Sequence, residues 1–195
     1  MAFPERIYLT GFMASGKSTV GLIVANTIGY QFADLDKVIE LAEGRSIEEV
    51  FRESGESYFR DAEAAALRET ARDASTVTAL GGGTLVTDAA YALLPTGSTV
   101  VYLDTKPAIL ARRLYYGRGT RPLMLDSDGN RLELADVEAR VVAMLADREK
   151  HYRRADIVVR SGERSIGKTV DAVVDALRKH GSSSHEDAVK SARQR

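Results

Sequence analysis

A glycine-rich stretch near the N-terminus carries side chains that suit phosphate binding. Residues 11–19 read Gly-Phe-Met-Ala-Ser-Gly-Lys-Ser-Thr, which matches the pattern G-x-x-x-x-G-K-S of the phosphate-binding loop. Its glycines let backbone N–H groups approach oxyanions closely, and the N-terminus of a following helix favours negative charge. Lys17 can reach the β- and γ-phosphates of a nucleotide, and the Ser18 hydroxyl is a hard oxygen ligand suited to Mg²⁺. The stretch therefore predicts binding of a nucleoside triphosphate.

The neighbouring sequence favours this interpretation over a chance glycine-rich turn. A short apolar run at 7–9 precedes the loop and predicts a strand, and residues 19–25 continue as a helical pattern. A strand before the loop and a helix after it are the context that the motif requires. The motif does not indicate which molecule is phosphorylated.

Two carboxylates follow the next predicted strand. Asp34 and Asp36 are two residues apart at the carboxyl end of that strand. In a parallel sheet this end faces the same crevice as the phosphate-binding loop. One carboxylate could contact Mg²⁺, directly or through water, and the other could contact a substrate hydroxyl. The alternative is that Asp36 only caps the next helix.

Three consecutive glycines, Gly81, Gly82 and Gly83, follow the strand expected over 76–80. Glycines at a strand end lose much conformational entropy on folding, so they are best explained by a ligand that must approach the backbone closely. A plain flexible turn is the alternative.

A basic segment interrupted by glycines covers approximately residues 112–131. Such a segment is typical of a mobile lid that brings a guanidinium group onto a phosphate. Transfer of a phosphoryl group needs charge stabilisation and exclusion of water more than covalent help. We favour Arg121 as the lid arginine because Pro122 fixes the chain beside it. The alternative is a solvated basic loop.

A second match to the loop pattern occurs at 162–169, which reads Gly-Glu-Arg-Ser-Ile-Gly-Lys-Thr. We reject it as a second triphosphate site because only 26 residues follow Thr169, too few for another sheet. Glu163 would also place an anion inside the cradle. The position of this segment after the last strand instead predicts that it lies near the nucleotide of the first loop, beside the base.

Apolar runs rich in β-branched residues alternate with helical patterns along the chain. This order predicts an α/β fold, with helices on both faces of a parallel sheet. Ser46 and Glu49 form a capping-box pattern, and Gly29 and Gly44 stop the helices before them. We expect strands near 6–10, 31–34, 76–80, 99–103 and 156–159. We expect helices near 17–28, 37–43, 46–53, 57–73, 88–94, 107–116, 133–150 and 165–179.

The composition excludes several classes of function. The net charge of −1 argues against a basic surface that binds nucleic acid and against a polybasic patch that binds a membrane. The absence of cysteine excludes disulfides and metal sites with thiolate ligands. No run approaches the ~18 apolar residues of a membrane span. We expect a soluble, cytoplasmic monomer with one domain over 1–180. Residues 181–195 lack apolar periodicity and predict a disordered tail.

Together these features resemble the shikimate kinases, small P-loop kinases of the nucleoside monophosphate kinase type. The resemblance covers about residues 6–177. It rests on the loop at 11–19, Asp34-Leu-Asp36, Gly-Arg-Ser-Ile at 44–47, Phe59-Arg60, Gly81-Gly82-Gly83, Arg121-Pro122-Leu123, and Arg148 followed by Tyr152. It implies a three-layer α/β/α fold with a five-stranded parallel sheet in the order 2-3-1-4-5. The implied activity is transfer of the ATP γ-phosphate to the 3-hydroxyl of shikimate, in chorismate and aromatic amino acid synthesis.

The resemblance also implies roles for particular residues. Lys17, Asp36 and Arg121 would be catalytic, with Asp36 holding the accepting hydroxyl and Arg121 contacting the phosphates. Arg60 and Arg148 would bind the shikimate carboxylate, because guanidinium groups bind carboxylates bidentately.

Further roles are implied for the nucleotide and the metal ion. Ser18, with Asp34 in support, would take Mg²⁺, and Gly82 would contribute backbone to the substrate site. Arg164 would lie against the adenine. The remaining nucleotide contacts would come from Gly11, Ala14, Ser15, Gly16, Lys17, Ser18, Thr19 and Arg121.

Three positions depart from the family pattern. Ala14 replaces a glycine, which we expect the loop to tolerate provided that the φ angle there is negative. Met124 stands where a second leucine usually follows Arg-Pro-Leu, a mild change of apolar packing. Residues 126–131 form a longer exit from the lid than is usual.

Three other functions are considered. A gluconate-type sugar-acid kinase shares the loop and the size, and its acceptor is also a carboxylated polyol, although the glycine triplet and Arg-Pro-Leu favour shikimate. A non-catalytic nucleotide-binding regulator would have no reason to keep Lys17, Asp36 and Arg121 together. A GTPase-like switch is disfavoured because the sequence lacks the guanine-reading pattern Asn-Lys-x-Asp.

Overall fold

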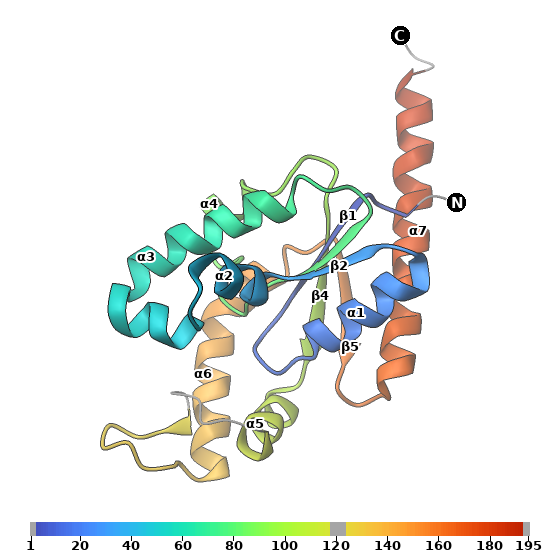
Figure 1. Cartoon of the computed structure of the whole chain (residues 1–195). Coiled ribbons are helices and arrows are strands. Elements are labelled where there is room, and N and C mark those ends of the chain that lie inside the picture. The colour runs from blue at the N-terminus through green and yellow to red at the C-terminus, as the bar shows by residue number, and fades with distance from the viewer. Residues whose placement is uncertain (1–2, 118–123, 193–195) are drawn as a thin grey trace.

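One parallel sheet forms the centre of the protein. The computed structural model describes residues 3–117 and 124–192, with side chains described as far as 181 (Figure 1). The strands are β1 (Arg6–Thr10), β2 (Gln31–Asp34), β3 (Thr76–Ala79), β4 (Thr99–Thr105) and β5 (Ile157–Ser161). They pair in the order β2-β3-β1-β4-β5, and each pairing is parallel. The predicted sheet and its strand order are confirmed.

Helices cover both faces of this sheet (Figure 1). They are α1 (Lys17–Ile28), α2 (Leu35–Glu43), α3 (Ile47–Thr70), α4 (Asp88–Tyr91), α5 (Pro107–Tyr116), α6 (Leu134–Tyr152) and α7 (Ile166–Ala192). Because alternate residues of a strand point to opposite faces, each strand contributes to two cores. Ile7 and Leu9 of β1 pack with α1 and α7, whereas Tyr8 packs with α2 and α3. The result is the predicted three-layer α/β/α arrangement.

A third core joins the carboxyl end of the sheet to α5 and α6. Tyr102 of β4 stacks on Tyr152 at the end of α6, with ring centroids 5.2 Å apart. Phe12 of the phosphate-binding loop and Met124 are buried in the same cluster. Met124 therefore fills an apolar position, as the mild leucine-to-methionine change predicts.

Local signals in the sequence fix several helix ends. Ser46 and Glu49 form the predicted capping box at the start of α3. Gly29 and Gly44 end α1 and α2 in the left-handed conformation, as expected for helix C-caps. The two helices predicted at 46–53 and 57–73 both form, and they meet within α3 without an intervening loop. Their boundary survives only as a break at Gly55, whose φ of 81° and ψ of 176° are not helical.

The other departures from the sequence predictions lie at the ends of elements. Strands β4 and β5 extend beyond their predicted ends, to Thr105 and Ser161, and these two residues are still paired. Helix α7 continues to Ala192, past the end at 179 that the sequence predicts, and the disorder expected over 181–195 stays a prediction. In Figure 1 this last part of α7 projects away from the sheet. Within the described residues, the helices are too short or too polar to cross a membrane.

Candidate active site

The phosphate-binding loop joins β1 to α1 and lies at the carboxyl edge of the sheet. Gly11 and Gly16 have φ angles of 139° and 100°, which a side chain would oppose. A Cβ on Gly11 would also lie 2.9 Å from the carbonyl oxygen of Leu103. Among the described residues, no side chain caps the start of α1. The first backbone N–H groups of this helix are therefore available to an anion.

Ala14 does not have the conformation that the sequence analysis expects. Its φ angle is 62°, in the left-handed region, where the expectation is a negative value. A β-carbon in this region crowds the following carbonyl and costs roughly 1–2 kcal/mol, whereas glycine avoids this crowding. The loop has thus kept the turn that a glycine normally makes, at the expense of local strain.

Lys17 is folded back onto its own loop. Its ammonium Nζ donates to the carbonyl oxygens of Gly11, at 2.8 Å, and Phe12, at 3.0 Å, and the residue is only 8% exposed. Its charge is therefore held beside the cradle formed by the loop backbone.

Asp34 and Asp36 share a cavity of about 230 Å³ with this loop. The cavity is also lined by Met13, Ala14, Gly16, Lys17, Ser18, Thr19, Leu80 and Gly82. The helix-capping role falls on Asp34, whose Oδ1 accepts the backbone N–H of Asp36 at 3.1 Å. The alternative that Asp36 caps α2 is therefore wrong.

The surroundings of Asp36 change its proton affinity. Burial raises the pKa of Asp36 above its ordinary value, and the negative charge of Asp34 raises it further. The positive charge of Lys17 acts in the opposite direction. A carboxylate with a raised pKa is a stronger proton acceptor, as a general base requires.

Arg60 lies on α3 with its guanidinium held by two carboxylates of the same helix. Nη1 donates to Oε2 of Glu63 at 2.8 Å, and Nη2 donates to Oε1 of Glu56 at 3.1 Å. Glu56 is exposed, but Glu63 is buried and also accepts the Thr84 hydroxyl at 2.6 Å. Glu63 is not among the site residues predicted from the sequence. The signal that could have found it is its spacing of three residues from Arg60, which places both on one helix face.

Arg148 and the glycine triplet meet across the site. Nη1 of Arg148 donates to the carbonyl oxygen of Gly82 at 3.4 Å, and the hydroxyl of Tyr152 donates to the same oxygen. A Cβ on Gly82 would lie 3.1 Å from the backbone nitrogen of Met13, so this turn packs directly against the phosphate-binding loop. On Gly83 it would lie 3.3 Å from Nη1 of Arg60. The triplet thus links Arg148, Arg60 and the loop.

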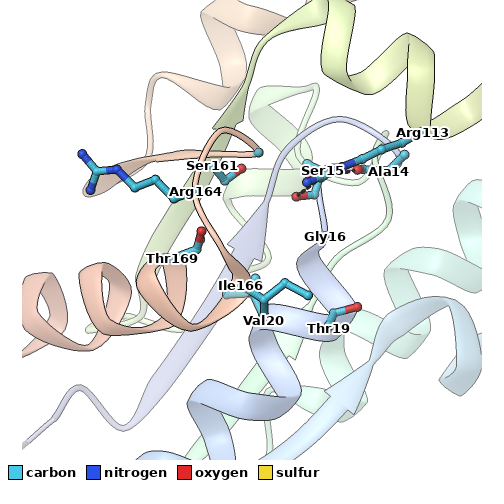
Figure 2. Close-up of a pocket in the computed structure, with 11 residues that line it drawn as sticks. Ala14, Ser15, Gly16, Thr19, Val20, Arg113, Ser161, Arg164, Ile166 and Thr169 are labelled. Carbon is cyan, nitrogen blue, oxygen red and sulfur yellow. Dashed lines mark hydrogen bonds between the residues drawn. The ribbon is translucent and has the colours of Figure 1, made fainter.

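A second cavity, of about 380 Å³, lies on the other side of the loop. Figure 2 shows its lining, which combines the loop with the segment that follows β5: Ala14, Ser15, Gly16, Thr19, Val20, Arg113, Ser161, Gly162, Arg164, Ile166 and Thr169. The second loop-like motif therefore lies beside the first, as predicted. The side chain of Arg164 extends away from the loop in this view.

The segment predicted to be a lid is described only at its two ends. Residues 112–116 belong to α5, and beyond it Leu125 pairs with Arg131 in an isolated antiparallel bridge. Between them, Asp126 accepts the backbone N–H groups of Asp128 and Asn130, which closes the exit segment into a turn. Arg121, the predicted lid arginine, lies outside the described residues.

The loop, the two carboxylates and the parallel sheet order together define a P-loop kinase. The family model for shikimate kinase matches residues 13–178 of the chain. A shikimate kinase from Prosthecochloris aestuarii (strain DSM 271 / SK 413) is 41% identical over 180 residues, which are 92% of this chain and 91% of that protein. The chain therefore belongs to the shikimate kinase family.

Solved structures agree with this assignment. A shikimate kinase from Bacteroides thetaiotaomicron matches with a TM-score of 0.80 and 28% identity, covering 89% of this chain and 98% of that one. A shikimate kinase from Acinetobacter baumannii, solved in complex with shikimate, matches with a TM-score of 0.79 and 28% identity, covering 90% and 94%.

Proposed function

We propose that this chain transfers the γ-phosphoryl group of ATP to the 3-hydroxyl of shikimate, giving shikimate 3-phosphate and ADP. One observation carries the proposal: Asp36 shares a single cavity with Lys17 and Ser18 of the phosphate-binding loop. An acid beside a triphosphate cradle is the arrangement that a kinase for an alcohol acceptor needs.

The nucleotide half of the site would use the loop. Backbone N–H groups at the start of α1 would hold the phosphates, and Lys17 would exchange its loop carbonyl partners for phosphate oxygens. Ser18 and Asp34 line the same cavity, and Mg²⁺ commonly uses one carboxylate together with phosphate oxygens, so these residues fit this ion. Mg²⁺ would supply charge neutralisation on the phosphates. The cavity of Figure 2 is the proposed place of the base, with Arg164 at its rim.

The acceptor half of the site would use Arg60, Arg148 and Gly82. Two guanidinium groups suit a small acid, because each can donate two parallel hydrogen bonds to a carboxylate. Glu63 is buried and would keep Nη1 of Arg60, whereas the exposed Glu56 would give up Nη2 to the substrate. The shikimate ring would then lie between these arginines and Asp36.

The chemical step moves one phosphoryl group and one proton. The 3-hydroxyl oxygen forms a bond to the γ-phosphorus while the bond from that phosphorus to the β–γ bridging oxygen breaks, which leaves ADP. The hydroxyl proton passes to Asp36. Because the transition state is loose in most analyses, Asp36 contributes more by aiming the hydroxyl than by early proton removal. Arg121 would close over the phosphates as their charge redistributes.

We propose further that the protein works as a monomer and that its activity is in the cytoplasm. Membership of the shikimate kinase family disfavours the gluconate-type alternative, and the retained acid and lysine disfavour a non-catalytic regulator.

An acceptor panel tests the proposed function. Purified protein with ATP and Mg²⁺ is assayed for ADP release with shikimate, with gluconate and with no acceptor. We expect release to rise at least a hundredfold with shikimate only. A rise with gluconate would assign the sugar-acid activity, and ATP binding without any acceptor-dependent release would assign the regulator.

A further inference from the structure

The last turns of α6 carry two side chains that meet at one backbone oxygen of the glycine triplet. Arg148 and Tyr152 are four residues apart, so they lie on the same face of this helix. Nη1 of Arg148 donates to the carbonyl oxygen of Gly82 at 3.4 Å, and the Tyr152 hydroxyl donates to the same oxygen. The roles that the family resemblance implies include Arg148 and Gly82, and they leave Tyr152 without a task.

The surroundings of Tyr152 keep its hydroxyl in place as a hydrogen-bond donor. The side chain is fully buried, and its ring stacks on that of Tyr102 with an interplanar angle of 28°. Phe12 of the phosphate-binding loop belongs to the same core. Burial raises the pKa of Tyr152 above its ordinary value, although the positive charge of Arg148 lowers it. The hydroxyl therefore keeps its proton at neutral pH and can donate it to Gly82.

Arg148 is held less firmly than Tyr152. Its side chain is half-buried, and its hydrogen bond to Gly82 is longer than is usual for an N–H donor. The guanidinium also lies over the ring of Phe12, 5.9 Å from the ring centroid. These weak contacts allow the guanidinium to turn toward a carboxylate. In the proposed function it does so when the acceptor binds, and it then leaves the carbonyl of Gly82.

The departure of Arg148 changes what the Gly82 carbonyl needs. Within the described part of the chain, Arg148 and Tyr152 are the two donors to this oxygen. A polar atom that loses its last donor inside a binding site is costly, so Tyr152 lowers the cost of releasing Arg148. The Gly82 carbonyl and the Gly83 N–H also share one planar peptide group. Tyr152 therefore keeps this turn in place while the arginine moves.

We propose that Tyr152 is a positioning residue for the acceptor: it holds the carbonyl of Gly82 so that the guanidinium of Arg148 is free to bind the substrate carboxylate. This role deepens the proposed function and rests on it. An acceptor without a carboxylate does not draw Arg148 away from Gly82. The effect of losing the Tyr152 hydroxyl is therefore confined to acceptors that carry an acid.

A comparison of two ligands tests this role. Tyr152→Phe removes the donor, and titration calorimetry gives the dissociation constants of shikimate and of its alcohol analogue, in which a hydroxymethyl group replaces the carboxylate. We expect shikimate to bind about tenfold more weakly, equivalent to about 1.4 kcal/mol, and the alcohol to change less than twofold. ATP binding should stay within twofold. As a matched control, Tyr102→Phe removes a hydroxyl from the other ring of the stack and should leave shikimate binding within twofold.

A double-mutant cycle tests whether Tyr152 acts through Arg148. Arg148→Met removes the guanidinium, and NMR titration measures the weaker shikimate binding that remains. In this background Tyr152→Phe should cost less than twofold, because there is no guanidinium to release.

An isosteric pair separates hydrogen bonding from packing at position 152. 4-Methylphenylalanine fills the space of the hydroxyl without a donor, and 4-aminophenylalanine fills it with an N–H donor. Thermal unfolding curves report the folding of each variant. If Tyr152→Phe is poorly folded, this pair carries the test. We expect the methyl variant to lose shikimate binding about tenfold and the amino variant to stay within threefold of the unmodified protein.

Three results would overturn the proposal. An equal loss for shikimate and the alcohol would mean that Tyr152 shapes the whole site. An equal loss with and without Arg148 would mean that Tyr152 acts independently of that guanidinium, and unchanged shikimate binding would mean that the hydrogen bond is dispensable. Because the readout is binding, a protein that binds shikimate without phosphorylating it would contradict the proposed function and leave this test interpretable.

Discussion

At the residue scale, Asp34 and Asp36 show how two identical side chains take different tasks. Asp34 accepts the N–H that begins α2, so it has a structural partner in the protein. Asp36 lies two residues further on, and it lines the same cavity as Lys17. Their spacing in the sequence predicts a shared crevice, but it does not decide which of them caps the helix.

Replacing Asp36 by Asn should lower kcat at least a hundredfold, because the hydroxyl loses its acceptor. ATP binding should stay within threefold. In the unmodified protein, kcat/KM for shikimate should fall tenfold per pH unit below the raised pKa of Asp36, since only the carboxylate accepts the proton. Steady-state kinetics from pH 4 to 8 check this. A variant that keeps more than a tenth of the activity would exclude Asp36 as the base.

The same substitution should stabilise the fold. Burial raises the pKa of Asp36 in the folded state, so its charge opposes folding at neutral pH, and this penalty disappears as the pH falls below that pKa. Asp36→Asn should therefore unfold at a temperature a few degrees higher at pH 7, and the difference should shrink towards pH 4. Scanning calorimetry at both pH values checks the sign. A variant less stable than the parent at pH 7 would contradict it.

Glu63 offers a test of how Arg60 is held. Glu63→Gln should raise the KM for shikimate about tenfold and leave the KM for ATP unchanged, because a buried carboxylate partner of Arg60 is lost. Glu56→Gln removes the exposed partner of the same guanidinium and should change either KM less than twofold. Equal effects of the two variants on the KM for shikimate would show that the burial of Glu63 does not determine how Arg60 binds the substrate.

At the element scale, α3 combines two segments that the sequence separates. The sequence predicts two helices, at 46–53 and 57–73, and both the capping box at Ser46 and the break at Gly55 are present. The chain nevertheless continues through Gly55, because a single residue with a positive φ angle redirects the helix without a loop. Sequence periodicity cannot distinguish a kink from a gap, since both interrupt the apolar stripe in the same place.

Gly55→Ala should lower the free energy of unfolding by about 1–3 kcal/mol, because its conformation is open only to glycine. Apart from the adjoining chain, no heavy atom lies within 4 Å of the new Cβ, so the expected loss comes from the backbone conformation. Gly167→Ala, near the start of α7 with equally open space, is the matched control. It should raise stability by about 0.4–1 kcal/mol. Urea unfolding checks both, and similar effects of the two substitutions would contradict the role of φ at Gly55.

At the scale of the whole molecule, the sheet order and the place of the site follow from the sequence because both are set by long-range regularities. Strand, helix and strand repeat along the chain, and the carboxyl ends of the strands must share one edge. Asp36, Gly82 and the loop therefore meet as expected. The conformation of Ala14 and the hydrogen bond from Arg113 to the carbonyl oxygen of Ala14 depend on the tertiary fold, and no local sequence pattern predicts them. The pairing of Arg60 with Glu63 is a local contact three residues apart on α3, and only the burial of Glu63 depends on tertiary packing.

The proposed function holds that the phosphate-binding loop, the carboxylate of Asp36 and the guanidinium groups of Arg60 and Arg148 act together on a small ring acid. The most direct measurement is phosphorus NMR of a reaction of the purified protein with ATP, Mg²⁺ and shikimate. We expect one new phosphomonoester resonance, coupled to the proton on carbon 3 of shikimate, in equal amount to the ADP formed, and none with Asp36→Asn. ADP accompanied by inorganic phosphate alone, or an ester on another hydroxyl, would contradict the claim.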